Sequence, residues 1–384
     1  MEKKKRIIIA KAGLDGHDQG VNVIKDFLIE EGHEVFYFRL YLQMEEIAEI
    51  AIQEGVDWIG LSVHNAAHCE YVKEIFDYLK DNNALDIGLI VGGIISEEDK
   101  IILEKEFGVK HIFVSGTPEA NLYNIRDFFG KNSGRNIDPK LILENKSRAN
   151  IGLFISELAN NSEEASGLVK NLLRKDVLTI GITGHQGAGK STLIGHLITQ
   201  FRALNKKVGV IAVDPSDCVS GGALLGRDRT QMWRHLFDDN VHIYSMATRG
   251  GHGGIADTTG LAVKAMKMVG CDIVMVETIG AGQDQAAVRT IADMTGLILT
   301  PDIGEDQVYK SGIMQIADFY VINKTDIMPA LPLEKFLNEM LDSRVNFSGK
   351  SKLRPFIINT NTMNENCLGI KKLAEKILEY GRNE

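Results

Sequence analysis

Two loops in the sequence combine residue types that proteins use for chemistry. One of them, GHQGAGKS at 184–191, matches the pattern G-x-x-x-x-G-K-[ST] in full. In this pattern, glycines let successive backbone N–H groups face a phosphate. We expect Lys190 to reach the β- and γ-phosphates of a nucleotide and Ser191 to bind Mg²⁺. The predicted nucleotide-binding residues of this loop are Gly184, Gly187, Ala188, Gly189, Lys190, Ser191 and Thr192.

The other loop lies in AKAGLDGHDQGVNV at 10–23 and has the pattern D-x-H-x-x-G, formed by Asp15, Gly16, His17 and Gly20. A phosphate loop would need a lysine here, so we expect a different ligand. Imidazole is a good ligand for cobalt, and a carboxylate two residues away can fix its tautomer. Cobalamin-binding domains have this pattern, with the histidine replacing the cofactor's dimethylbenzimidazole below cobalt. A solvated loop histidine is the alternative interpretation.

The segment VINKTD predicts which base the nucleotide carries. Asn323, Lys324 and Asp326 match the N-K-x-D pattern at the end of an expected strand. The aspartate can accept from guanine N1–H and the exocyclic amine, a pair that adenine does not offer. Asn and Asp are also common turn formers, so the pattern alone is weak. After a phosphate loop, it favours guanine.

Three carboxylates between these motifs are candidates for organising the metal ion. Asp214 and Glu277 end expected strands, and Asp228 lies in a glycine-rich stretch. Carboxylates at strand ends facing a phosphate loop commonly hold Mg²⁺ and its waters. A helix cap or a turn is the alternative role for each of them.

The elements that must position these residues alternate between strand and helix. Apolar runs such as RIIIA and DWIGLSV are followed by segments of helical periodicity, and the phosphate loop lies between VLTIGIT and STLIGHLITQF. This alternation predicts α/β folds with parallel sheets. We expect a Rossmann-like, flavodoxin-like domain at 1–130, a linker with a helical segment at 131–175, and a P-loop GTPase domain at 176–384.

Composition excludes some classes of function. The chain has 384 residues and a net charge of −9, which argues against nucleic-acid binding. It has no apolar run approaching the roughly 18 residues of a membrane span, and the start of the chain does not match a signal peptide. The four cysteines have no CxxC spacing. We therefore expect a cytoplasmic protein with no membrane partner.

The second half resembles the MeaB/ArgK family of P-loop GTPases, the G-protein chaperones of cobalamin-dependent acyl-CoA mutases. The resemblance covers about residues 150–365 and rests on AVDPS, SGGALLG, MATRGGHGG, ETIGAGQ and GIMQIADFYVINKTD. It implies Mg²⁺ ligation by Ser191, Asp214, Asp228 and Glu277, and an approach of Lys310 to the phosphates. Lys190, Lys310 and Glu277 are the expected catalytic residues. Two departures are an extra Arg227 before Asp228 and a GEDQVYKSG loop one residue short.

Residues 5–130 resemble the C-terminal domain of methylmalonyl-CoA mutase and the small subunits of related acyl-CoA mutases. The resemblance implies adenosylcobalamin bound base-off with His17 on cobalt, and Ser62 hydrogen-bonded to the buried nucleotide tail. It adds a later set of cofactor-binding residues, which are Gly92, Gly93, Gly116 and Thr117. The family's S-x-L leucine is His64 here, and we assign His64 no catalytic role. His68 aligns with a mutase histidine, and a structural or surface role is an alternative.

The sequence shows no (β/α)₈ barrel of about 250 residues, the part of a mutase that binds acyl-CoA. We therefore expect a cobalamin-binding subunit fused to its GTPase chaperone. It would use GTP/GDP and Mg²⁺ and need a separate large subunit for isomerisation. An adenosyltransferase is a further candidate partner, and we expect a homo- or hetero-oligomer. A free-standing cobalamin carrier or sensor is the alternative function. A methyl carrier is disfavoured, because the first strand begins by residue 6 with no helical cap before it.

Overall fold

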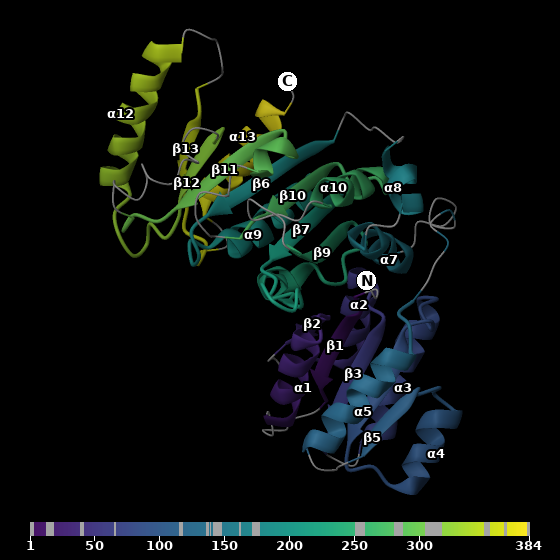
Figure 1. Ribbon diagram of the computed structural model, residues 1–384. Coiled ribbons are helices and arrows are strands. Elements are labelled where there is room, and N and C mark those ends of the chain that lie inside the picture. The colour runs from purple at the N-terminus through teal and green to yellow at the C-terminus, as the bar shows by residue number, and fades with distance from the viewer. Residues whose placement is uncertain are drawn as a thin grey trace. The chain divides into compact units, whose positions relative to one another are not determined.

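The computed structural model describes residues 4–12, 19–38, 42–64, 67–114, 118–135, 138, 140, 148–160, 163–170, 177–249, 258–279, 287–303, 317–348, 354–364 and 367–381. The chain forms two compact units, each an α/β structure (Figure 1). Unit 1 comprises Met1–Leu172, Asp214–Arg227 and Tyr244–Gly250, and unit 2 comprises Leu173–Val213, Asp228–Ile243 and Gly251–Glu384. The predicted boundaries at 130 and 175 stay a prediction.

Unit 1 is built on a six-stranded sheet in the order β5-β4-β3-β1-β2-β8, and every pairing is parallel. The first five strands have the doubly wound order of flavodoxin-like folds, which confirms the predicted fold class. Ligands bind such sheets at the carboxyl ends of the strands. The strands are β1 (Arg6–Lys11), β2 (Glu34–Tyr37), β3 (Trp58–Val63), β4 (Gly88–Gly93), β5 (His111–Val114) and β8 (Ala223–Leu225).

Helices cover both faces of this sheet, which explains why its strands are almost continuously apolar (Figure 1). The helices that flank the sheet are α1 (Gln19–Glu30), α2 (Met44–Glu54), α3 (His68–Asp81), α4 (Glu97–Lys105) and α5 (Pro118–Lys131), and unit 1 also contains α7 (Arg148–Ala159) and α8 (Glu163–Lys170). One core joins α1 and α5 to the strands. Helix α7 packs on α2 where two glycines meet, because a Cβ on Gly55 would lie 2.3 Å from the carbonyl carbon of Gly152.

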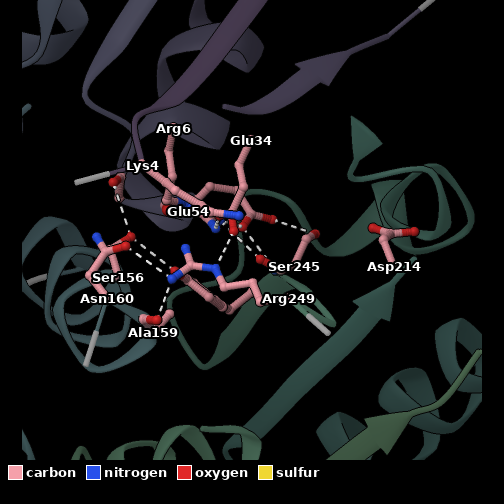
Figure 2. Close-up of polar contacts among 12 residues, drawn as sticks. Lys4, Arg6, Glu34, Glu54, Ser156, Ala159, Asn160, Asp214, Ser245 and Arg249 are labelled. Carbon is pink, nitrogen blue, oxygen red and sulfur yellow. Dashed lines mark hydrogen bonds and ion pairs between the residues drawn. The ribbon is translucent and has the colours of Figure 1, made fainter. Parts of the chain in front are cut away.

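A buried ion cluster holds β1, β2 and α2 to the segment Tyr244–Gly250 (Figure 2). The Arg6 guanidinium lies 2.7 Å from Glu34 Oε2 and 2.9 Å from Glu54 Oε2, and all three side chains are about 99% buried. Arg249 Nε lies 2.6 Å from the other oxygen of Glu34. Burial alone would raise the pKa of the Glu34 carboxyl, but Arg249 and Arg6 outweigh it and lower this pKa to about 2.

Unit 2 is built on a seven-stranded sheet in the order β13-β12-β11-β6-β10-β7-β9. The strands are β6 (Leu178–Gly184), β7 (Val208–Asp214), β9 (Val241–Ala247), β10 (Ile273–Glu277), β11 (Met294–Leu299), β12 (Phe319–Ile322) and β13 (Phe356–Asn359), and the ends of β7 and β9, Asp214 and residues 244–247, are counted in unit 1. The helices are α9 (Lys190–Ala203), α10 (Thr259–Met268), α12 (Leu331–Ser348) and α13 (Leu368–Tyr380), with a 3-10 helix η1 (Asp228–His235). One core joins α9 and α13 to the sheet, and a second core joins α12 to β11 and β12.

Among the described residues, no helix has the length and apolar character needed to cross a bilayer.

We predict that Arg6→Ala strongly destabilises unit 1. The substitution leaves the Glu34 and Glu54 carboxylates buried with one cation fewer, which typically costs about 3–5 kcal/mol. Urea unfolding monitored by circular dichroism measures the effect. Arg126→Ala is the matched control, because the Arg126–Glu31 pair is exposed and contributes little. Equal midpoints for the two variants would contradict the prediction.

Candidate cofactor and nucleotide sites

Unit 1 has a cavity of about 180 Å³ at the carboxyl ends of its central strands, lined by residues of β1, β3, β4, β5, α1 and α5. Four predicted cofactor-binding residues line it, which are Gly20, Ser62, Gly92 and Gly93. The rest of the wall is mostly aliphatic and aromatic, with Leu28, Ile125 and Phe129 among its residues. An apolar slot with a single serine hydroxyl suits a flat aromatic group such as a benzimidazole.

Glycines make this cavity possible. Gly93 has a φ of +147°, and a Cβ there would lie 1.9 Å from the carbonyl oxygen of Val63 in the neighbouring strand. At Gly20, near the start of α1, a Cβ would meet no atom within 4 Å, so this glycine leaves space open. The small residues therefore let the strand ends approach each other while the cavity remains unfilled.

The two histidines near this site differ in their surroundings. His64 is exposed, lines the cavity and has its Nε2 3.4 Å from Ser62 Oγ, so it forms a polar rim where the family pattern has leucine. His68 is 2% exposed at the start of α3, and its Nδ1 lies 4.0 Å from Asp99 Oδ2. Burial within the helix layer fits a structural role for His68.

Five of the predicted cofactor-binding residues lie outside the described residues. They are Asp15, Gly16, His17, Gly116 and Thr117. Helix α1 begins at Gln19, two residues after His17. Their predicted roles stay predictions.

In unit 2, the phosphate loop connects β6 to α9, as its motif requires. Gly187 and Gly189 have φ angles of +81° and +90°, which favour glycine. A Cβ on Gly184 would lie 2.3 Å from the carbonyl oxygen of Ile298. Lys190 Nζ donates to the carbonyl oxygens of Gly184 and His185 at 3.3 and 3.4 Å, so the lysine lies folded over the loop.

Three of the four predicted magnesium ligands are described within unit 2, and they meet at one point. Ser191 Oγ lies 2.8 Å from both Asp228 Oδ1 and Glu277 Oε1. Hard oxygen ligands of this kind fit Mg²⁺, which usually keeps water and phosphate oxygens as its other ligands. No group of three or more His, Cys, Asp or Glu side chains among the described residues is placed to hold a metal by itself.

The remaining predicted residues of the metal and phosphate site are placed differently. Asp214 belongs to unit 1, where its Oδ2 accepts the Gly226 N–H at 3.1 Å. Lys310 lies outside the described residues. The extra Arg227 does not displace its neighbour from the site, since Asp228 is the residue that contacts Ser191.

The predicted base-recognition residues are tied to the phosphate loop through one buried amide. Asn323 Nδ2 donates to the carbonyl oxygen of Ala188 at 2.8 Å and to Thr362 Oγ1 at 3.2 Å. Asn323 Oδ1 accepts from Thr360 Oγ1 at 3.1 Å. Asp326 is exposed three residues later. Asn323 therefore holds the phosphate loop and the residues after β13 together. Asp326 lies at the surface, where it is accessible to the expected base.

The two threonines are functional candidates that the sequence analysis missed. Thr360 and Thr362 follow β13, which neighbours the strand that leads to Asn323. A signal for them is present in the sequence, because the apolar run PFIIN at 355–359 is typical of a strand and polar residues follow it directly. Polar residues after adjacent parallel strands meet at one sheet edge.

The fold and these sites define a P-loop nucleotide-binding unit and a unit of cobalamin-binding type. A family model described as "Methylmalonyl Co-A mutase-associated GTPase MeaB" matches residues 148–383, and one described as "B12 binding domain" matches residues 5–121. The chain belongs to the MeaB family of mutase-associated GTPases and carries a B12-binding domain before it.

Curated relatives match either one part or most of the chain. A protein of Pyrococcus abyssi named as a GTPase is 42% identical over 231 residues, which are 59% of this chain and 70% of the relative. The fused isobutyryl-CoA mutase of Geobacillus kaustophilus is 30% identical over 355 residues, 83% of this chain and 31% of the relative. That of Nocardia farcinica is 27% identical over an alignment that covers 97% of this chain and 36% of the relative. The chain thus spans about a third of the length of these mutases.

We predict that Gly20→Leu impairs cobalamin binding without loss of stability. The protein can still fold, because a Cβ at this position meets no neighbouring atom, but the leucine side chain occupies the cavity. The affinity for adenosylcobalamin should therefore fall at least about tenfold. Absorption titration measures the affinity. Gly130→Leu in α5 is the control, since its Cβ also meets no atom within 4 Å and Gly130 does not line the cavity. Equal affinities in the two variants would show that the ligand does not use this cavity.

We predict that Asp326→Asn shifts the base preference from guanine toward xanthine. Aspartate accepts two guanine N–H groups, whereas asparagine offers one acceptor and one donor. Loss of one hydrogen bond to a charged group corresponds to a loss of GTP affinity of about 10- to 150-fold. Fluorescence titration with GTP and XTP tests this. If both nucleotides lose affinity equally, Asp326 does not contact the 2-position of the base.

Proposed function

We propose that this protein is the cobalamin-binding component of an adenosylcobalamin-dependent acyl-CoA mutase, joined to its own GTPase chaperone. GTP binding and hydrolysis would control the loading and protection of the cofactor. The observation that supports this most is the presence, in one chain, of an apolar cavity at the strand ends of a B12-binding domain and a Ser191–Asp228–Glu277 cluster beside a phosphate loop.

On the cobalamin side, we propose that His17 binds cobalt from below and that Asp15 orients its ring. The nucleotide tail would occupy the cavity beside Ser62 and the glycines, with Gly16, Gly116 and Thr117 completing the site. When bound, adenosylcobalamin supplies the organic radical that starts a carbon-skeleton rearrangement. The residues of this chain would hold the nucleotide tail in an apolar cavity that excludes water, and Asp15 would set the basicity of the His17 ring.

On the nucleotide side, we propose that Lys190 neutralises the charge that develops on the β- and γ-phosphates. Ser191, Asp228 and Glu277 would hold Mg²⁺, with Asp214 joining through its waters. Lys310 would add a second cation at the phosphates. Release of Lys190 from the loop carbonyls that it now contacts would accompany nucleotide binding, because phosphate oxygens are stronger acceptors.

We propose that isomerisation requires a separate large subunit that binds the acyl-CoA. The fused relatives support this, because they are named isobutyryl-CoA mutases and the alignment covers only 31% to 36% of their length. An adenosyltransferase would deliver the cofactor, and assembly with either partner makes an oligomer. Co-purification with a candidate large subunit tests this arrangement, and a protein that binds both ligands but no such subunit would instead be a carrier or sensor.

We predict that His17→Ala abolishes the base-off, His-on absorption spectrum of bound adenosylcobalamin and leaves GTP hydrolysis unchanged. The imidazole is the proposed lower ligand of cobalt, and the nucleotide site uses other residues. His64→Leu is the control, which restores the family leucine and should keep the histidine-ligated spectrum. An unchanged spectrum in His17→Ala would refute the assignment of the ligand.

A further inference from the structure

One strand of the B12-binding domain's sheet comes from the GTPase region of the chain. Strand β8 lies within residues 148–383, which match the GTPase family, yet it pairs in parallel with β2 of the domain matched at 5–121. The register joins Glu34 to Ala223 and Phe36 to Leu225, and the Ala223 N–H donates to the carbonyl oxygen of His33 at 3.0 Å. Strand β8 is the sixth strand of the sheet and ends it.

The segment that contains β8, residues 214–227, leads at both ends to predicted magnesium ligands. It begins at Asp214, and Asp228 follows its last residue. Asp228 is only three residues from Leu225, a length of chain that spans about 11 Å at most. A displacement of Asp228 on binding nucleotide must therefore be absorbed by Gly226 and Arg227 or reach β8.

The same segment rests on the carboxyl end of helix α1. Ser220 Oγ donates to the carbonyl oxygen of Ile29 at 2.8 Å, and Lys4 Nζ donates to the carbonyl oxygen of Gly221. Gly222 is in close contact with the helix, because a Cβ there would lie 2.0 Å from the same Ile29 oxygen. No side chain larger than that of glycine fits at Gly222 while this contact is kept.

Helix α1 connects this contact to the cofactor site. Val21, Ile24 and Leu28 of α1 line the cavity, and the helix begins at Gln19, directly after the predicted cobalt-binding loop. The helix has 12 residues, so it is about 18 Å long. A displacement of α1 at Ile29 therefore also displaces the cavity wall and the start of the helix, because a helix of this length moves as one rigid element.

The neighbouring segment, residues 244–249, is held to β2 and α2 by several hydrogen bonds (Figure 2). The N–H and Oγ of Ser245 donate to Glu54 at 2.8 and 2.9 Å, and Arg249 donates to Glu34 and to Asn160. These groups belong to the buried ion cluster, in which the loss of one partner leaves an uncompensated buried charge. The Thr248 N–H donates to the Asp214 carbonyl oxygen at 3.0 Å, so the backbone at the start of residues 214–227 is held to this segment.

We propose that residues 214–227 carry the nucleotide state to the cobalamin site by changing the contact of β8 and Ser220 with β2 and α1. This inference rests on the proposed function and names the element that performs the regulation. Nucleotide and magnesium would reposition Asp228 and the Asp214 side chain, which now accepts the Gly226 N–H. The shift passes through β8 and the Ile29 contact to α1, and so changes the affinity of the cavity for the cofactor.

The test compares the affinity for adenosylcobalamin in the presence of GDP and of a non-hydrolysable GTP analogue. In the wild-type protein we expect a ratio of about 5- to 150-fold between the two states. Gly222→Ala should bring this ratio near 1 while each ligand alone binds within about threefold of wild type, because neither site contains Gly222. Gly130→Ala, where a Cβ has open space, should keep the wild-type ratio.

Two further measurements keep the proposal falsifiable. Ser220→Ala removes only the hydroxyl bond to Ile29, so it should lower the ratio even if Gly222→Ala fails to fold. Hydrogen exchange should show that the amides of β2 and of the end of α1 change protection between the nucleotide states. A wild-type ratio of 1 would refute the proposed gating function itself. A large wild-type ratio that survives in the Gly222→Ala protein, or in Ser220→Ala if the former does not fold, would refute the role of 214–227 alone.

Discussion

The buried guanidinium of Arg6 is the interaction on which unit 1 depends. It is 1% exposed, contacts Glu34 and Glu54, and lies 4.5 Å from the centre of the Tyr244 ring. A charge in this position is tolerated only when its partners are present in the correct geometry, because desolvation costs several kcal/mol per ion. Tyr244 and the Ser245 carbonyl oxygen come from the GTPase region of the chain. The B12-binding domain therefore satisfies its central cation partly with groups from outside its own matched sequence.

This dependence explains why unit 1 contains three separate pieces of the chain. Segments 214–227 and 244–250 are short, but one of them completes the sheet and the other completes the ion cluster. A parallel sheet that ended at β2 would leave unpaired N–H and C=O groups along an apolar strand, a common cause of aggregation. Strand β8 covers that edge with only three residues.

The sequence predicted what is determined locally and missed what is determined by distant pairing. The phosphate loop, its strand and its helix follow from glycine, lysine and apolar periodicity within residues 178–203, and the structure has them there. The alternation of strands and helices and the handedness of crossovers leave only a few strand orders for the first five strands, and the flavodoxin-like order is one of them. By contrast, ALL at 223–225 is too short to identify as a strand, and its partner lies almost 190 residues earlier. Nothing near it in the sequence encodes that pairing.

The candidate sites show the same division. Ser191 and Glu277 could be grouped from the sequence because a motif and a strand end fix each of them separately. Thr360 and Thr362 could be found only by knowing that β13 neighbours β12, since hydrogen bonds to Asn323 define their role. The contact of Gly222 with Ile29 also depends on residues that are distant in the sequence, and in our proposal it connects the nucleotide site to the cobalamin site. A glycine that looks like part of an ordinary turn in the GTPase region is required where it stands because a helix of the B12-binding domain leaves no space for a side chain. Selection on that residue would then act through cofactor control rather than through nucleotide binding.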